Sequence, residues 1–253
     1  MAKHISYWVF RAVRGLVKLF YPRPELVGAD QLPEGPCVIV GNHAQMNGPI
    51  VAELYVPGDR SIWCNAEMMH LEEVPDYACR DFWSRKPGYI RWFYRLLSYA
   101  IAPLSVCIFN NAHCIGVYRD ARIMATLRQS LKRLKEGARI VIFPETDPPL
   151  NHVLYTFQNR FIDIGRLYAH QTGSPLAFVP MYIAPTLRRT VFGPPIYYDP
   201  AADPEAERRR VCAALAQAVT DMACALPPHR VVPFRNIPKH LYPMNIPDEA
   251  PER

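Results

Sequence analysis

Cysteine patterns that would indicate a disulfide scaffold or a zinc site are missing from the sequence. Its seven cysteines are scattered, odd in number and never spaced as Cys-x-x-Cys. His113, His152 and His170 also lack ligand spacing to carboxylates or cysteines. We therefore expect a reducing, cytosolic environment and no bound metal.

Signals for secretion or membrane crossing are missing as well. The amino terminus has no cleavage-site pattern, and Arg11, Arg14 and Lys18 interrupt its apolar residues. No run reaches the roughly 20 uninterrupted apolar residues of a membrane-spanning helix. These absences leave binding to a membrane surface open.

Several function signals are absent too. The chain has no internal repeat, no Gly-rich loop that would cradle phosphates and no stretch that mixes basic and aromatic residues as nucleic-acid modules do. It also has no Gly-x-Ser-x-Gly elbow of a hydrolase. We therefore expect no nucleic-acid partner. The formal net charge of +6 suits an anionic membrane or phosphorylated substrates, although solubility alone would also explain it.

The sequence does contain enough apolar residues, about half of its 253, to form the core of one large α/β domain. We predict a single domain with a mixed, largely parallel central sheet flanked by helices, among them helices over 121–136, 157–171 and 206–226. An N-terminal amphipathic helix occupies 1–22, the α/β domain 23–226 and a Pro-rich tail 227–253. The tail has no clear period and either wraps the domain or stays mobile.

Residues 4–21 predict a helix that Pro22 ends. Arg11, Arg14 and Lys18 fall on one stripe, and aromatic and aliphatic residues cover much of the remainder. This composition is typical of a helix that lies in a lipid interface. An amphipathic helix packed on the core is the other interpretation.

Residues 91–109 are the most apolar part of the chain. Pro103 is expected to break them into a helix and a strand, neither long enough to cross a bilayer. Both halves then belong to the core, or residues 92–97 line an acyl groove or touch lipid.

The most informative stretch surrounds His43. Cys37 to Val40 suit a buried strand, Gly41 and Asn42 follow, and His43 stands just before an apolar helical pattern. In α/β sheets, ligands usually bind at the carboxyl ends of strands, and the positive end of a helix dipole keeps a histidine neutral and able to accept a proton. A histidine that merely caps the helix is the alternative.

Three further segments complete a pattern. They are 116–119, 141–146 and 177–182, and with the His43 stretch they resemble, in order and spacing, the four motifs of the glycerolipid and lysophosphatidate acyltransferase family. The resemblance covers roughly residues 30–190, and its matching residues are Asn42, His43, Arg119, Phe143, Pro144, Glu145 and Pro180. Two departures stand out: Gly48 replaces the Asp of the first motif, and Thr146-Asp147-Pro148 replaces Gly-Thr-Arg in the third.

This resemblance implies an acyltransferase-like fold and O-acyl transfer from acyl-CoA or acyl carrier protein, with no other cofactor. The acceptor would be a hydroxyl of a glycerolipid-like molecule, as in phospholipid biosynthesis, and the protein would lie on the inner face of the membrane. His43 would be the general base and Arg119 the ligand of an acceptor phosphate. The other expected substrate-binding residues are Asn42, Phe143, Pro144, Thr146 and Pro180.

The family's Asp orients the histidine ring, and Gly48 cannot do so. In the serine-protease triad, exchange of the orienting Asp for Asn lowers turnover about 10⁴-fold. Asn47, Glu145 and Asp147 are the candidate substitutes, Asn47 without a charge and the two carboxylates from the neighbouring strand end. The alternative is a catalytically inactive acyltransferase-like domain that binds lipid or acyl carriers.

Overall fold

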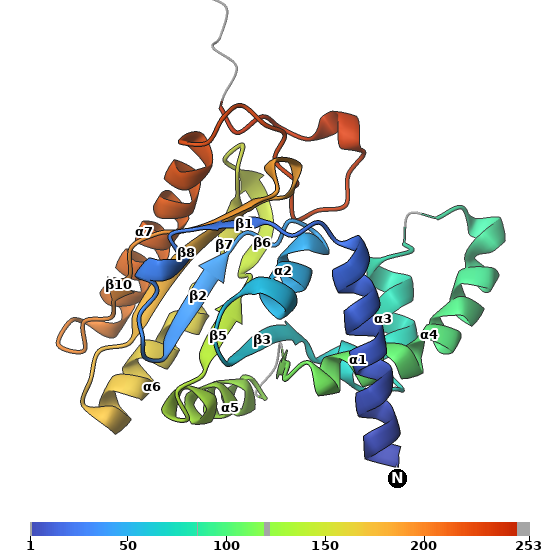
Figure 1. Ribbon diagram of the computed structural model, residues 1–253, viewed down its shortest axis with the longest axis horizontal. Helices are drawn as coiled ribbons and strands as arrows, with labels where there is room; N and C mark the ends of the chain where they lie inside the picture. Colours follow the sequence, from blue (N-terminus) through green and yellow to red (C-terminus); the bar gives the residue numbers. More distant parts are fainter. Residues whose placement is uncertain (1, 85, 119–121, 247–253) are drawn as a thin grey trace, which may run out of the picture. The chain divides into compact units, whose positions relative to one another are not determined.

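The computed structural model describes residues 2–84, 86–118 and 122–246 and forms two compact units (Figure 1). One unit comprises residues 1–21 and 61–129, and the other comprises residues 22–60 and 130–253. The predicted α/β fold class, with a mixed and largely parallel sheet flanked by helices, is confirmed.

The sheet of the second unit has the strand order β1-β9-β8-β2-β5, and β10 also pairs with β8. Its strands are β1 (Glu25–Val27), β2 (Cys37–Gly41), β5 (Arg139–Ile142), β8 (Ala177–Ala184), β9 (Arg189–Phe192) and β10 (Ile196–Tyr197). β2 runs parallel to both β5 and β8, while β9 and β10 are antiparallel to β8. Every residue of β2 and β8 is buried, as expected of apolar runs in strands covered on both faces.

Pro180 lies inside the central strand β8, where a missing N–H would normally break a ladder. The pairing of β8 with β9 begins at Met181, and its pairing with β10 involves Phe178 and Ala177. Pro180 therefore occupies the gap between the two antiparallel partners, and its carbonyl accepts the Gly193 N–H at 2.9 Å.

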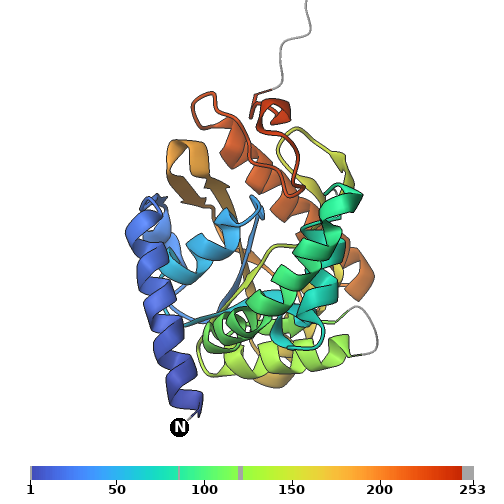
Figure 2. The ribbon, with the colours of Figure 1, turned by 90° about the vertical axis from the view of Figure 1, so that its right-hand side faces the viewer.

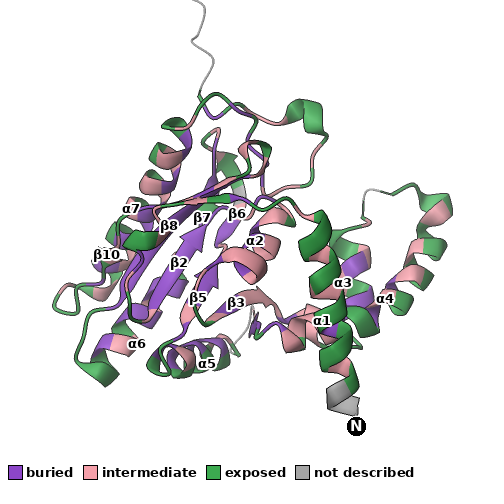
Figure 3. Cartoon of the chain, in the orientation of Figure 1, coloured by how far each residue is buried: buried purple, intermediate pink, exposed green. Residues whose placement is uncertain are grey.

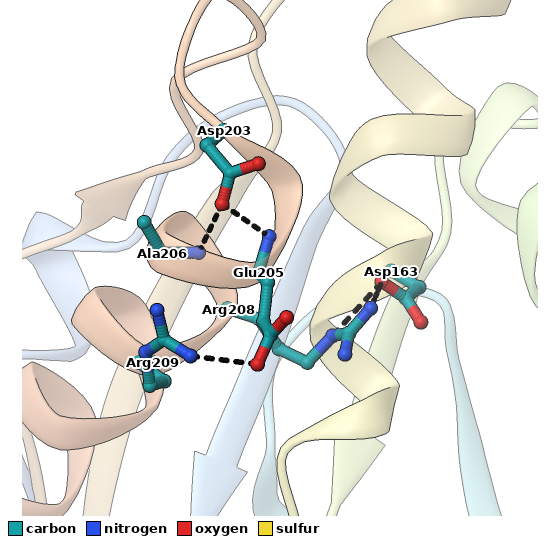
Figure 4. A network of polar contacts seen from close by, with 6 residues as sticks. All are labelled: Asp163, Asp203, Glu205, Ala206, Arg208 and Arg209. Atoms are coloured by element: carbon teal, nitrogen blue, oxygen red, sulfur yellow. Dashed lines mark hydrogen bonds and ion pairs between the residues drawn. The ribbon is translucent and has the colours of Figure 1, made fainter.

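The second unit also contains the helices α2 (Asn47–Tyr55), α6 (Asp163–Thr172) and α7 (Pro204–Cys224), while α5 (Ile123–Lys135) carries the chain into it. α7 buries Val211, Leu215 and Val219 and packs on β8. Asp203 caps α7 by accepting the N–H groups of Glu205 and Ala206, and Arg208 pairs with Asp163 at the start of α6 (Figure 4).

The helix predicted over 157–171 begins later than expected. A hairpin of β6 (Glu145–Leu150) and β7 (Tyr155–Phe157) comes first, and α6 starts only at Asp163. In β7, Tyr155 and Phe157 are buried while the residue between them is exposed. That alternation is a strand period, but three residues are too few to distinguish it from a helical pattern.

In the first unit, β3 (Arg60–Asn65) pairs in parallel with β4 (Ile115–Val117), and the helices are α1 (Ala2–Phe20), α3 (Val74–Asp81) and α4 (Arg91–Asn111). The helix predicted at the N-terminus is thus confirmed. α1 packs on α4, where Asn111 donates to Ser6 Oγ at 2.8 Å.

The predicted break at Pro103 is wrong, because α4 is one continuous helix with Pro103 inside it. An internal proline removes one backbone hydrogen bond and destabilises a helix by about 3 kcal/mol. In α4 the helix nevertheless continues on both sides of Pro103. Residues 88–111 are long and apolar enough to cross a membrane by length and composition, although one such helix is weak evidence of a span. Most of α4 is exposed or half-exposed, and only a narrow strip of Ser98, Ala102 and Ser105 is buried (Figure 3).

Candidate functional site

The site begins where β2 ends, at the buried side chain of Asn42. Its Nδ2 donates to the Ile183 carbonyl at 3.0 Å, and its Oδ1 accepts the Ile183 N–H at 2.7 Å. The amide thereby extends the pairing of β2 with β8 by one residue beyond the strand. Asn42, expected to bind substrate, contacts protein backbone and fixes the point at which the chain leaves the sheet.

The turn after His43 is left-handed. Ala44 and Gln45 have φ values of 46° and 56°, a conformation that costs non-glycine residues about 1–2 kcal/mol each. The Asn47 N–H donates to the Ala44 carbonyl at 3.1 Å, and the Asn47 side chain donates to the same oxygen at 2.9 Å. Asn47 therefore helps to close the turn. Backbone strain of this kind is often concentrated at functional sites.

Gly48 is required by the same turn. Its N–H donates to the His43 carbonyl at 3.0 Å, so the two residues lie against each other. A Cβ at position 48 would lie 2.4 Å from that carbonyl oxygen and 3.0 Å from the Phe143 ring. The Asp of the family motif therefore does not fit this backbone.

Glu145, the first residue of β6, is buried beside His43. Its Oε1 accepts the His43 backbone N–H at 2.6 Å, and its Oε2 accepts the Tyr155 N–H at 3.0 Å. Burial raises the pKa of this carboxyl to about 7, although the two backbone hydrogen bonds oppose the shift. Glu145 thus holds the backbone of His43 from a buried position that raises its own pKa.

Two aromatic rings flank the imidazole of His43. The Phe143 ring centroid is 5.4 Å away and the Phe234 ring centroid 5.3 Å away, both edge-on to the imidazole. Phe234 also lies 6.4 Å from the ring of Tyr155. The sequence alone gives no signal for Phe234 or Tyr155, because neither residue belongs to a motif or to a clear hydrophobic period.

Phe234 reaches the site on the C-terminal segment, residues 227–246, which folds back as a closed loop. Asn245 joins its ends by exchanging hydrogen bonds with the backbone of His229 at 2.8 and 3.0 Å. His229 in turn contacts the hydroxyl of Tyr182 in β8 at 2.8 Å. The two views agree that this segment and the β6–β7 hairpin lie at the same end of the unit (Figures 1 and 2). The described part of the tail therefore wraps the domain.

Gln45 ties this loop to the strained turn. Its Nε2 donates to the Tyr242 hydroxyl at 3.0 Å and to the Arg235 carbonyl at 3.3 Å. Gln45 thus has an unfavourable backbone φ, and the hydrogen bonds of its side chain offset part of the energetic cost of that conformation.

The remaining predicted residues differ in position. Phe143 and Glu145 adjoin His43, and the carbonyl of Pro144 accepts the Gln158 N–H at 2.9 Å. Thr146 is half-buried in β6, and Pro180 lies opposite Val40, near the end of β2. Arg119 and the side chain of Asp147 lie outside what the structure describes. Within the described residues, no three His, Cys, Asp or Glu side chains are grouped to hold a metal ion, and the expected absence of a metal stays a prediction.

No protein-family model and no curated protein sequence matches the chain. A solved structure with a similar fold is the 1-acyl-sn-glycerophosphate (LPA) acyltransferase PlsC from Thermotoga maritima, with 14% identity and a TM-score of 0.48. The similarity covers 90% of this chain and 85% of that one. Values this low assign no activity, so the function must come from the site itself.

Proposed function

We propose that the protein is an O-acyltransferase that moves a fatty acyl group from acyl-CoA or acyl carrier protein to a hydroxyl of a glycerolipid-like acceptor. The observation that supports this most is the contact between two motif segments far apart in the chain. Glu145 of Phe143-Pro144-Glu145 accepts the backbone N–H of His43 at 2.6 Å. His43 stands at the carboxyl end of a central strand, the usual ligand side of such sheets.

In this proposal His43 acts as general base. The imidazole takes the proton of the acceptor hydroxyl, and the oxygen attacks the thioester carbonyl. The tetrahedral intermediate then collapses, the C–S bond breaks, and the thiolate leaves with the proton that the imidazolium returns. Glu145 contributes by positioning the His43 backbone, because its carboxylate accepts the backbone N–H groups of His43 and Tyr155.

The test is a search for product. Purified protein and lipid vesicles are incubated with radiolabelled acyl-CoA or acyl carrier protein and a panel of hydroxylated lipids. We expect a labelled ester with the wild type and none with His43→Ala. A labelled ester formed equally well by His43→Ala would exclude this mechanism.

The second candidate is an inactive acyltransferase-like protein that binds lipid or acyl carriers. The closed space at Gly48 supports it, because no orienting Asp fits there. Pro148 in place of the third motif's Arg also supports it. Saturable binding of the acyl donor without product from any acceptor would favour this candidate.

We further propose that the protein binds the cytoplasmic face of an anionic membrane through α1 and α4. Trp8 on α1 is 62% exposed, and Trp92 and Leu96 on α4 are 70% and 63% exposed. Arg11 stacks on the rings of Tyr7 and Trp8, so a cation accompanies the exposed aromatic side chains. Aromatic and cationic side chains together are typical of helices in a lipid interface.

A further inference from the structure

Cys224, the last residue of α7, lies beside an imidazole that the proposed acyl transfer does not use. Its Sγ is 3.7 Å from Nε2 of His152, which belongs to the loop between β6 and β7. The thiol also donates to the Asn245 carbonyl at 3.3 Å. A nucleophile and a base are therefore within hydrogen-bond reach of each other, where a helix end, a hairpin loop and the C-terminal segment meet.

Cys224 is also accessible from solvent. It is exposed, and His152 is half-buried. The other cysteines are less accessible: Cys37, Cys114 and Cys212 are buried, and Cys64, Cys79 and Cys107 are half-buried. Burial raises the pKa of Cys37 and of Cys212 to about 11, so these two thiols stay protonated at neutral pH. A thiol reagent in solution should therefore react with Cys224 first.

The charges near Cys224 make its reactivity depend on His152. A cysteine reacts as the thiolate. The negative end of the α7 dipole lies at Cys224, and Asp221 lies one turn earlier on the same helix, so both oppose a thiolate and favour an imidazolium. Burial, with smaller effects of Cys224 and Glu145, raises the pKa of the Tyr182 hydroxyl, which therefore stays neutral. An imidazolium at 3.7 Å is thus the partner that would stabilise the thiolate.

Asn245 connects this thiol with the segment that carries Phe234. The Asn245 Nδ2 donates to the Ala223 carbonyl at 2.8 Å, and its Oδ1 accepts the His229 N–H at 2.8 Å. Asn245 thus ties the C-terminal segment to the last turn of α7, and its own carbonyl accepts the Cys224 S–H. A group attached to Sγ would remove that hydrogen bond and would need space where the segment meets the helix.

We propose that Cys224 and His152 form a thiol–disulfide exchange site, at which a low-molecular-weight disulfide modifies Cys224 and loosens the C-terminal segment. The imidazole takes the S–H proton, and the Cys224 thiolate attacks one sulfur of the disulfide. The S–S bond of the reagent breaks, a mixed disulfide forms on Cys224, and the leaving thiolate takes the proton from the imidazolium. The number of disulfide bonds is unchanged, so the step needs no further oxidant.

The rate and position of modification test the exchange site. The full chain is incubated with oxidised glutathione under native conditions, and the modified residue is identified by mass spectrometry of the digested protein. We expect one glutathionyl group, on Cys224, and a rate that is at least about 10-fold lower in His152→Asn. Asn accepts the left-handed φ of 66° at position 152, so this variant should unfold at the same denaturant concentration as wild type.

His240→Gln is the matched control, because it removes an imidazole from an exposed position of the C-terminal segment. It should be modified at the wild-type rate. Modification of His152→Asn as fast as of this control, or first modification at a different cysteine, would overturn the exchange site.

Hydrogen exchange tests the effect on the C-terminal segment. In the modified protein, amides of residues 227–246 should exchange about 2- to 10-fold faster, the range for the loss of one hydrogen bond, while those of α6 stay unchanged. A reductant should restore the slower exchange, and Cys224→Ser treated with oxidised glutathione should not change. Unchanged exchange of residues 227–246 in fully modified protein would overturn the loosening. Neither measurement uses acyl transfer, so both stand whether or not the proposed catalysis does.

Discussion

Aromatic side chains gather in two regions of this molecule, and their exposure differs. Around His43, Tyr155 is buried and Phe143 and Phe234 are half-buried, in contact with one another or with the imidazole. On α1 and α4, Trp8 and Trp92 point outward and are more than half exposed. The first set limits water around a titratable group, whereas the second offers apolar area to a partner surface. Substitutions in the two regions should therefore have separable effects.

The largest effect on stability is expected at Gly48. Gly48→Ala places a Cβ 2.4 Å from the His43 carbonyl oxygen, and backbone cannot yield as a flexible side chain can. We expect a loss of about 3 kcal/mol in unfolding free energy and of acyl transfer by at least about 100-fold, with membrane binding unchanged. Denaturant unfolding and transfer assays measure both.

Gly48→Asp sharpens that prediction. The family motif has Asp at this position. If Gly48 differed from the motif only by lacking the orienting carboxylate, Gly48→Asp would raise the rate of acyl transfer. The turn geometry predicts instead that Asp damages transfer as much as Ala does. Higher transfer by Gly48→Asp than by wild type would show that the turn differs from the one described.

The next largest expected effect is the loss of membrane binding when the cations of α1 are replaced. Replacing Arg11, Arg14 and Lys18 with Gln should lower the partition of the protein onto anionic vesicles about 10- to 100-fold, since each cation near an anionic surface contributes roughly 1 kcal/mol. Transfer to a soluble short-chain acceptor should stay at the wild-type rate. Co-sedimentation measures the partition.

A matched control is α5, whose Arg128, Lys132 and Lys135 are exposed. Their replacement with Gln removes the same charge from a helix without exposed tryptophan. If this variant loses as much binding as the α1 variant, net charge rather than the α1 face is responsible.

A smaller effect concerns the protonation of Glu145. Because burial raises its folded-state pKa to about 7, above the usual carboxyl value of about 4.3, the folded chain holds this proton more tightly than the unfolded chain. That contribution to stability is complete below the unfolded pKa and is lost as pH rises through 7. Glu145→Gln has no such titration, so the stability of wild type relative to this variant should fall by about 2–3 kcal/mol from pH 5 to pH 8. A constant difference in denaturant unfolding would contradict the burial.

The smallest effect is expected at Gln45. Gln45→Ala removes the contacts to Tyr242 and Arg235 but keeps the strained φ. It should therefore lower the free energy of unfolding by about 1–2 kcal/mol. Gln45→Gly loses the same contacts but accepts the left-handed conformation, so it should be more stable than the Ala variant by about 1 kcal/mol. Thermal melts of the pair measure this difference, and equal stabilities would exclude strain at the turn.

Hydrophobic patterns in the sequence predicted the secondary structure that depends on neighbouring residues. The apolar run of Cys37 to Val40 suited a buried strand, and the residues after it placed His43 at the strand end, as the structure shows. The predicted break at Pro103 was wrong because a proline lowers the stability of a helix but does not prevent it from forming. Its neighbours on both sides kept the helix intact.

The side chains that complete the site could not be predicted, since long-range contacts bring them there. Phe234 reaches His43 only because Asn245 closes a Pro-rich loop that has no period of its own. The closed space at Gly48 likewise depends on the left-handed turn at Ala44 and Gln45, which neither residue type favours.

The central claim is that His43 removes the acceptor proton, and single-turnover acyl transfer by His43→Gln tests it most directly. Gln approximates the size of the imidazole but cannot act as a base, so transfer should fall about 10²- to 10⁴-fold. His170→Gln, at an exposed position of α6, is the control and should retain the wild-type rate. A His43→Gln protein that transfers the acyl group as fast as this control would contradict the account.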